Sequence, residues 1–322
     1  MTTTAPRQVP APTAGPEPAL RVGPVRRRAS RTRRQQNRAA YLFILPFFVF
    51  FVLMLVVPLV YSGYLSVFRE QLIGGLSFVG LDNYSRALQD PEFLAGLGRV
   101  GLFLVVQVPI MLALALIFAL VLDSGRLRFA GFVRLGIFLP YAIPGVIAAL
   151  MWGYLYGQDF GPFAQIAQFF GLPAPQFLSS QWMLASIGNI TTWSFVGYNM
   201  IIIFAALRAV PEELYEAATM DGAGAIRVAW SIKIPAVRPA LMLTVIFSII
   251  GSFQLFTEPQ LLKTIAPTVI DGAYTPNLYA YTLAFSRNEL NYAAAVSFLL
   301  GFLIMVISYV VQLSTQRKER SR

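Results

Sequence analysis

The chain has 322 residues, of which 57% are hydrophobic and 12% are charged, and its mean hydropathy is +0.63. A soluble domain is about half apolar and about a quarter charged, so this composition indicates a membrane protein. The chain contains neither Cys nor His, which excludes disulfides, thiol nucleophiles, imidazole bases and the usual zinc and haem sites. The net charge of +10 is therefore tested first against membrane topology rather than nucleic acid.

Residues 1–40 are rich in Pro, Ala and Arg and lack apolar periodicity, so we expect a disordered basic arm. Residues 317–322 form a short basic tail, and the stretch 41–316 between them contains apolar runs long enough to cross a bilayer. Six transmembrane helices of an all-α membrane protein are expected, at about 41–63, 100–122, 135–158, 182–207, 239–257 and 290–316. Pro140 and Pro144 predict a kink in the third span.

Lys and Arg residues are distributed unequally between the segments that join these spans. Twenty of the 25 lie in 1–40, 123–134, 208–239 and the tail after 316, whereas five lie in the alternate loops. Cytoplasmic loops carry the excess of Lys and Arg, so the pattern predicts that both termini are cytoplasmic. Dividing the long apolar run 160–207 into two spans would mix the two charge sets, which favours six.

The expected spans contain no ionisable side chain. Asp123 and Glu258 lie only at span ends, where we expect them to reach water. Carriers driven by protons or sodium usually hold ionisable groups within their helices, so such a relay is not indicated. The remaining external acids show no tight pattern that would serve catalysis or metal binding, namely Glu70, Asp82, Asp90, Glu92 and Asp159. We expect no catalytic residue and no metal site.

The loop 208–238 contains a predicted short helix. Pro211 suits a first helical position, Glu213 lies at the positive end of the helix dipole, and Gly222 is a natural stop. Its apolar face would comprise Leu214, Tyr215 and Ala218. The acidic character disfavours an anionic membrane surface, so a docking helix for a cytoplasmic partner is the better interpretation.

The residues of this loop also resemble a known signature. Glu216-Ala217-Ala218, then Gly222, then Ile232 to Pro235, resembles the EAA motif of permease subunits in binding-protein-dependent, ATP-driven importers. Ile234 stands where that family usually has Leu. The runs 138–144 and 291–295 are similar to segments of the sugar-importing branch, and the chain looks like the maltose-permease first-subunit type without its extra amino-terminal spans.

The resemblance implies the type I ABC importer permease fold and a multi-pass location in a prokaryotic inner membrane. It implies coupling to a separate ATPase through Glu213, Glu216, Ala217, Ala218, Asp221 and Gly222. The sequence has no Gly-x-x-x-x-Gly-Lys-Ser/Thr loop, so ATP and Mg²⁺ would be bound by the partner and this chain would hold no cofactor. The implied partners are a second homologous permease subunit, an ABC ATPase dimer, an extracytoplasmic sugar-binding protein and membrane lipid, with no nucleic acid.

Sugar recognition uses aromatic faces together with amide and hydroxyl groups. The fourth and fifth spans offer this mixture in Trp193, Tyr198, Asn199, Ser248, Ser252 and Gln254. Tyr198 matches the position at which the maltose permease carries a sugar-contacting Tyr, and the other five are chosen by chemistry alone. A di- or oligosaccharide is expected, and a polyol, glycerol phosphate or a self-contained secondary carrier remain alternatives.

Overall fold

The computed structural model describes residues 29–320 except 72 and 126, and side chains from 40 to 314. Two compact units are present, Met1–Pro58 and Leu59–Arg322. The first unit contains α1 (Ala29–Phe51), the π-helical turn η1 (Val52–Val56) and the start of α2 (Val57–Ser66). Residues 1–28 of the expected arm and 321–322 of the tail lie outside the described residues.

The arm differs from the sequence prediction in its last part. Helix α1 begins at Ala29, so residues 29–40 are helical and not an irregular segment. This stretch is rich in Ala, Arg and Gln, which are good helix formers, and it is continuous with the apolar helix that follows. The composition of residues 1–40 indicated disorder, but composition does not show that the adjacent apolar helix can extend backwards into residues 29–40.

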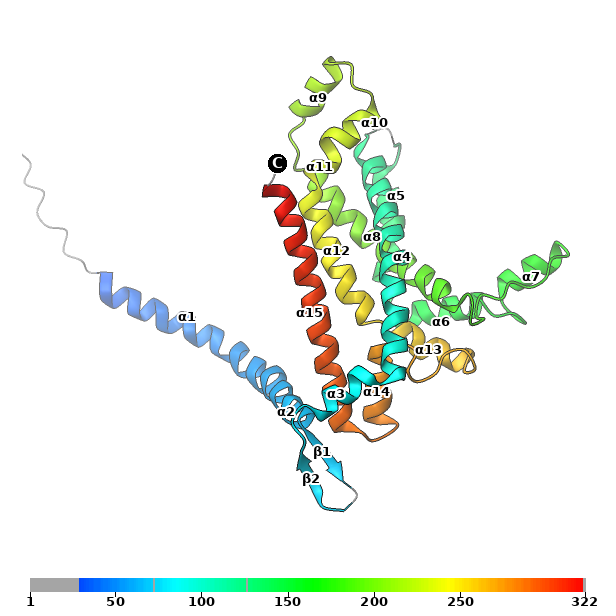
Figure 1. The fold of residues 1–322 in the computed structure, drawn as a ribbon. Helices are drawn as coiled ribbons and strands as arrows, with labels where there is room; N and C mark the ends of the chain where they lie inside the picture. The colour runs from blue at the N-terminus through cyan, green and yellow to red at the C-terminus, as the bar shows by residue number, and fades with distance from the viewer. Residues whose placement is uncertain (1–28, 72, 126, 321–322) are drawn as a thin grey trace, which may run out of the picture. The chain divides into compact units, whose positions relative to one another are not determined.

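The second unit is built almost entirely of helices (Figure 1). It opens with β1 (Phe68–Gln71), β2 (Gly75–Phe78), α3 (Asp82–Gln89), α4 (Pro91–Asp123), α5 (Ala130–Phe138), η2 (Leu139–Ala142), α6 (Gly145–Leu155), α7 (Pro162–Phe169) and α8 (Met183–Leu207). It continues with α9 (Glu213–Met220), α10 (Ala225–Val228), η3 (Ala229–Lys233), α11 (Ile234–Ala236), α12 (Arg238–Phe253), α13 (Thr257–Ile265), α14 (Pro276–Phe285) and α15 (Leu290–Arg320). The two strands form an antiparallel hairpin in which Phe68 pairs with Phe78.

Among the described residues, four helices are long and apolar enough to cross a membrane, and up to six spans result if each bent pair counts as one. The four are Ala40–Ser66, Pro91–Asp123, Met183–Leu207 and Leu290–Ser314. The expected third span is broken, because Ala130–Ala142 and Gly145–Leu155 meet at 96°. Pro140 and Pro144 flank this break, so the predicted kink is confirmed and is sharper than a bend within one helix.

The fifth expected span also meets its preceding segment at an angle. Ala225–Ala236 and Arg238–Phe253 are bent by 65° relative to each other, so α10, η3 and α11 lie across the start of α12. Pro235 and Pro239 lie on either side of this bend. The bend allows α9 and α10 to leave the line of the long helices while remaining attached to α12.

The second unit has two distinct ends (Figure 1). One, here called the α9 end, contains α9, α10 and the last residues of α15, and the Lys233–Asp123 ion pair brings the end of α4 there. The other, here called the hairpin end, contains β1, β2, α3 and α14. Three of the segments that hold the Lys and Arg excess thus lie at one end of this unit, as the predicted topology requires.

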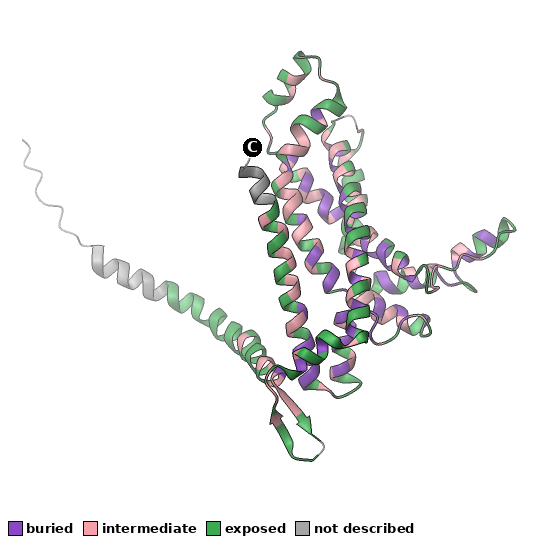
Figure 2. Cartoon of the chain, viewed as in Figure 1, coloured by how far each residue is buried: buried purple, intermediate pink, exposed green. Residues whose placement is uncertain are grey.

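Helix α8 packs against α4 and α5 through small residues. Ala115 and Ala119 of α4 are fully buried against Met200 and Ile203 of α8. A methyl group added at Gly197 would lie 2.1 Å from the carbonyl oxygen of Ile137, so α8 touches the backbone of α5. Figure 2 shows buried residues along these long helices and a largely exposed α9, in which no residue is buried.

The hairpin end is held by a cluster centred on Asp90. Its carboxylate caps α4 by accepting the amide hydrogen of Glu92 at 2.9 Å, and it accepts hydroxyl hydrogens from Tyr279 at 2.6 Å and Tyr292 at 2.7 Å. Arg287 donates twice to the Glu92 carboxylate, at 2.8 and 3.1 Å. Asp90 and Glu92, two of the external acids, thus belong to a hydrogen-bonded cluster that stabilises this end of the unit.

The tyrosines also change the acidity of Asp90. Partial burial opposes ionisation, but the hydrogen bonds from Tyr279, Tyr292 and the backbone amides outweigh it and hold the pKa of Asp90 below its usual value. Burial and the neighbouring Asp90 raise the pKa of Tyr279. The cluster therefore holds Asp90 as an anion and Tyr279 as a hydrogen-bond donor at neutral pH.

Candidate functional site

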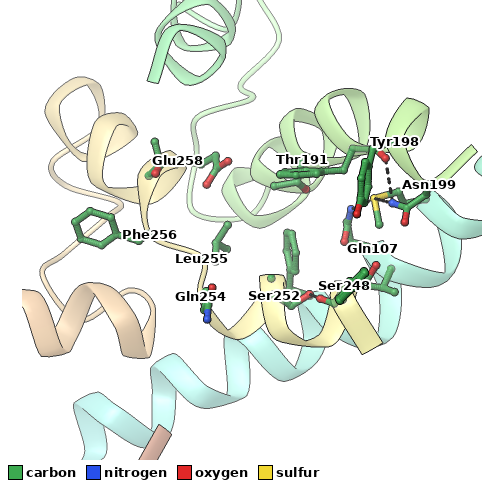
Figure 3. A pocket seen from close by; sticks show the side chains of 17 residues that line it. Gln107, Thr191, Tyr198, Asn199, Ser248, Ser252, Gln254, Leu255, Phe256 and Glu258 are labelled. Atoms are coloured by element: carbon green, nitrogen blue, oxygen red, sulfur yellow. Dashed lines mark hydrogen bonds between the residues drawn. The ribbon is translucent and has the colours of Figure 1, made fainter. Parts of the chain in front are cut away.

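A cavity of about 330 Å³ lies between α4, α8, α12 and α13 (Figure 3). Its polar lining is almost entirely uncharged and consists of amides, hydroxyls and one phenol. Five of the six residues predicted for the substrate pathway line it, namely Tyr198, Asn199, Ser248, Ser252 and Gln254. These residues come from the fourth and fifth expected spans, and the fold brings them to one cavity.

Internal hydrogen bonds orient the polar side chains of the cavity. The Asn199 amide donates to the carbonyl of Phe195 at 3.0 Å, and the Ser252 hydroxyl donates to the carbonyl of Ser248 at 2.7 Å. Tyr198 stacks on Tyr141, with 4.8 Å between ring centroids. These contacts hold one amide and one aromatic ring in fixed orientations, which suits recognition of a neutral, hydroxylated ligand.

Trp193 does not line the cavity. Its ring packs edge-on against Trp152, with 5.7 Å between centroids, so its predicted place beside Tyr198 in the pathway is not supported by the geometry. Gln107 and Thr191 line the cavity instead, and Gln107 donates to Thr192 at 3.1 Å. The sequence could have indicated Gln107, because it is the one amide side chain within the second expected span.

Glu258 is the one carboxyl group among the residues that line the cavity, and no Lys or Arg lines it. It lies in the first turn of α13, just after the fifth expected span, and is half-buried, so it keeps partial access to water as expected for a group at a span end. Burial raises the pKa of Glu258. Among the described side chains no ion pair includes it. In Figure 3 it lies apart from Tyr198 and Asn199, toward α13.

The second candidate region is α9 with the turn that follows it. The helix runs from Glu213 to Met220, and Gly222 follows with φ +77°, so the predicted short helix and its glycine stop are confirmed. The predicted coupling residues are mostly on its open surface: Glu213, Glu216, Ala217, Asp221 and Gly222 are exposed, and Ala218 is half-buried.

The apolar side chains around α9 divide into two groups. Leu214 and Met220 are exposed, as are Ile226 and Trp230 of the following segment, at 78% and 69%. Tyr215 and Ala218 are half-buried instead, so the predicted apolar face is only partly open. Leu214 and Met220 lie outside the candidate spans, where large exposed apolar side chains commonly mark an interaction surface. Ile226 and Trp230 lie in Ala225–Ala236, the first half of a bent candidate span.

A buried ion pair joins the end of α4 to η3, the segment that follows α9 and α10. Lys233 of η3 donates to the carboxylate of Asp123, and their side chains are only 14% and 4% exposed. The expectation that Asp123 reaches water is wrong, because the bend before α12 brings Lys233 over it. The Lys233 ammonium also lies 4.8 Å from the centre of the Tyr215 ring.

The model of the family of inner membrane components of binding-protein-dependent transport systems matches residues 28–320. The chain belongs to this family. The resemblance inferred from the EAA motif is thereby confirmed, and the family is one of transport components rather than enzymes.

Individual relatives match along most of their length. The lactose transport system permease protein LacF of Rhizobium radiobacter is 30% identical over 285 residues, which cover 87% of this chain and 95% of that protein. The diacetylchitobiose uptake system permease protein NgcF of Streptomyces coelicolor is 30% identical over 312 residues, covering 92% and 87%.

Solved structures share the fold. A chain of a bacterial ABC transporter involved in the import of the acidic polysaccharide alginate superposes with a TM-score of 0.78 at 19% identity, covering 89% of this chain and 98% of that one. This likeness concerns the fold alone.

Proposed function

We propose that this chain is one of two homologous permease subunits of an ATP-driven importer for a neutral di- or oligosaccharide in a prokaryotic plasma membrane. It crosses the membrane six times with both termini in the cytoplasm, so the α9 end is cytoplasmic. A separate ABC ATPase dimer docks on α9, and an extracytoplasmic binding protein delivers the sugar at the hairpin end. The chain forms half of the pathway and holds no nucleotide.

The observation that carries the proposal is the cavity with Tyr198, Asn199, Ser248 and Ser252 on its wall. An aromatic face with fixed amide and hydroxyl groups is the chemistry that binds sugar rings. Two relatives are named for the transport of lactose and of diacetylchitobiose, both of which are neutral disaccharides. The polar cavity wall is formed by helices that would lie in the membrane, where a transported solute must pass.

The charge of the cavity favours a neutral sugar over the glycerol phosphate alternative. A phosphate ester would enter beside the Glu258 carboxyl group, and no lining Lys or Arg would balance the charge of the phosphate. A polyol would meet no such repulsion, but its open chain offers no ring face to stack on Tyr198. A neutral sugar is therefore the ligand that would contact both the aromatic ring and the amide and hydroxyl groups of the cavity.

Support for docking on an ATPase comes from α9. It exposes acidic side chains and the apolar Leu214 and Met220 at an end of the molecule that lies away from the sugar cavity. The adjacent Ile226 and Trp230 extend the apolar surface. A loop that only connected two spans would not need such a surface in water, whereas a helix that inserts into a cleft of a partner would.

The test is to isolate the tagged full chain from its native membrane in mild detergent, identify the co-purifying proteins by mass spectrometry and assay the eluate for ATP hydrolysis. We expect a second six-span permease and an ATPase. Reconstituted vesicles should then import neutral disaccharides, and glycerol phosphate should not compete. Recovery of the chain alone, even after crosslinking, would overturn the proposal in favour of a self-contained carrier.

A further inference from the structure

Lys233 contacts both α4 and α9, and these two helices would move differently if α9 docked on a partner. On one side its ammonium donates to Asp123, the last residue of α4. On the other side it lies 4.8 Å from the ring of Tyr215, which belongs to α9. One cation therefore joins the helix that would receive force from the ATPase to a helix of the sugar cavity.

The burial of these groups makes the connection specific. Asp123 and Lys233 are 4% and 14% exposed, so each would leave the other as an unpaired buried charge if they separated. Tyr215 and Ala218 are the residues of α9 that are half-buried, the other six being exposed. Of the two, Tyr215 is the one whose ring faces the ion pair.

The local backbone is unusual at the same place. Residues Ala229–Lys233 form a π-helical turn, η3, between the α-helical turns of α10 and α11. Such turns are rare and occur frequently at functional sites. Here the turn precedes the 65° bend into α12. It ends at Lys233, which donates a hydrogen bond to Asp123 of α4.

The route then continues along α4. Gln107, Val108 and Met111 of this helix line the sugar cavity, and they lie 12 to 16 residues before Asp123 in the same helix. A displacement of α9 that carried Lys233 with it would pull on Asp123 and so move α4 at the cavity wall. No separate element is needed between the docking helix and the sugar.

We infer that the Lys233–Asp123 ion pair, with Tyr215 packed on it, is the joint that transmits movement of α9 to α4 and so couples ATP hydrolysis to sugar movement. This inference rests on the proposed function, because it takes α9 as the ATPase-docking helix. Asp123, Lys233 and Tyr215 are positioning residues in this role, since none of them lines the cavity.

The experiment measures sugar imported per ATP hydrolysed in vesicles that contain the co-purified complex. Asp123→Asn and Lys233→Met should each lower this ratio by about tenfold while ATP hydrolysis continues. The charge exchange of Asp123→Lys with Lys233→Asp restores an opposite-charge pair, and we expect it to recover most of the ratio. A residue with only a structural role would lower assembly, hydrolysis and import together.

Tyr215 supplies a matched pair of variants that leaves the ion pair intact. Tyr215→Leu removes the ring from Lys233 and should lower the ratio by about fivefold, whereas Tyr215→Phe keeps the ring. Among the described residues the Tyr215 hydroxyl has no hydrogen-bond partner, so Tyr215→Phe should behave as wild type. Arg287→Gln, which breaks an exposed ion pair at the hairpin end, should also leave the ratio unchanged.

The outcomes separate this inference from the proposed function. If the wild-type complex contains no ATPase, the proposed function fails. If the wild-type complex couples hydrolysis to import and Asp123→Asn keeps the wild-type ratio, only the joint is overturned. Should Asp123→Asn fail to assemble, Tyr215→Leu decides: a ratio equal to that of Tyr215→Phe overturns the joint, and a lowered one supports it.

Discussion

Each end of the second unit is stabilised by polar contacts, but the contacts at the two ends differ in number and in burial. At the hairpin end, Asp90 accepts from two tyrosines and the backbone, and the exposed pairs Arg287–Glu92 and Arg86–Glu289 lie beside it. At the α9 end, one buried pair, Asp123–Lys233, joins α4 to the segment before α12. The first arrangement comprises several polar contacts that are partly in water. The second has one ion pair that is shielded from water, next to the apolar packing of Leu122 and Val237.

The two ends should therefore respond differently when one contact is lost. Several contacts that share the same groups keep their geometry when one is lost, so the hairpin end forms a fixed base. A buried ion pair is costly to separate, because each partner would be left as an unpaired buried charge, so a displacement of one partner should carry the other with it.

Asp123→Ala should destabilise the protein by about 3–5 kcal/mol, because it leaves the Lys233 ammonium buried without its partner. Thermal unfolding in detergent, followed by circular dichroism, measures the loss. The matched control removes both charges, in Asp123→Leu with Lys233→Met, and should recover most of it. If the single variant were as stable as wild type, the pair would be no more important than a surface contact.

Tyr279→Phe and Tyr292→Phe should each cost about 1–3 kcal/mol, since each removes one hydrogen bond to the Asp90 carboxylate. The same unfolding assay applies. Because the two hydroxyls share one acceptor, the double variant should lose more than the sum of the single losses. Strict additivity would show that the tyrosines act independently and that the hairpin end is not redundant.

The stability that Asp90 contributes should depend on pH. Its pKa is lower in the folded chain than in the unfolded chain, so this stability is complete above the unfolded value of about 3.9 and is lost as the pH falls below it. Unfolding measured between neutral pH and about pH 3 should show this decline in the wild type. Asp90→Asn lacks the titrating group, and its profile should lack this part of the slope.

Arg287→Gln should change stability by less than about 1 kcal/mol, because both partners of its ion pair are more than two-fifths exposed. Moderate salt should reduce even this effect. A loss comparable to that of Asp123→Ala would contradict the contrast between the ends, since an exposed pair would then matter as much as a buried one.

The features that sequence reasoning found are those encoded within one segment. The α9 helix, its stop at Gly222 and the break at Pro140 and Pro144 depend on nearby residues, and the structure contains all three. The cavity residues of α8 and α12 could be chosen because polar side chains are conspicuous in apolar spans. Their meeting in one cavity then followed from the packing of those spans.

The features that it missed depend on contacts between distant segments. Asp90 is 189 residues from Tyr279 and 202 from Tyr292, and Asp123 is 110 residues from Lys233, so no local pattern reports these contacts. Trp193 was selected by chemistry, but helix rotation turns it toward Trp152. In each case the deciding quantity is which face of a helix meets which neighbour.

Helix α4 runs without interruption from the Asp90 cap at one end to Asp123 at the other. Its 33 residues correspond to a length of about 50 Å at 1.5 Å per residue, and a helix of this kind resists stretching. Pro109 lies near its middle, beside Gln107 and Met111 of the cavity wall, and its ring removes a backbone hydrogen bond there. One continuous helix thus connects the Asp90 cluster at the hairpin end with the buried Asp123–Lys233 pair at the α9 end. Between the two, at the cavity wall, it lacks one of its backbone hydrogen bonds.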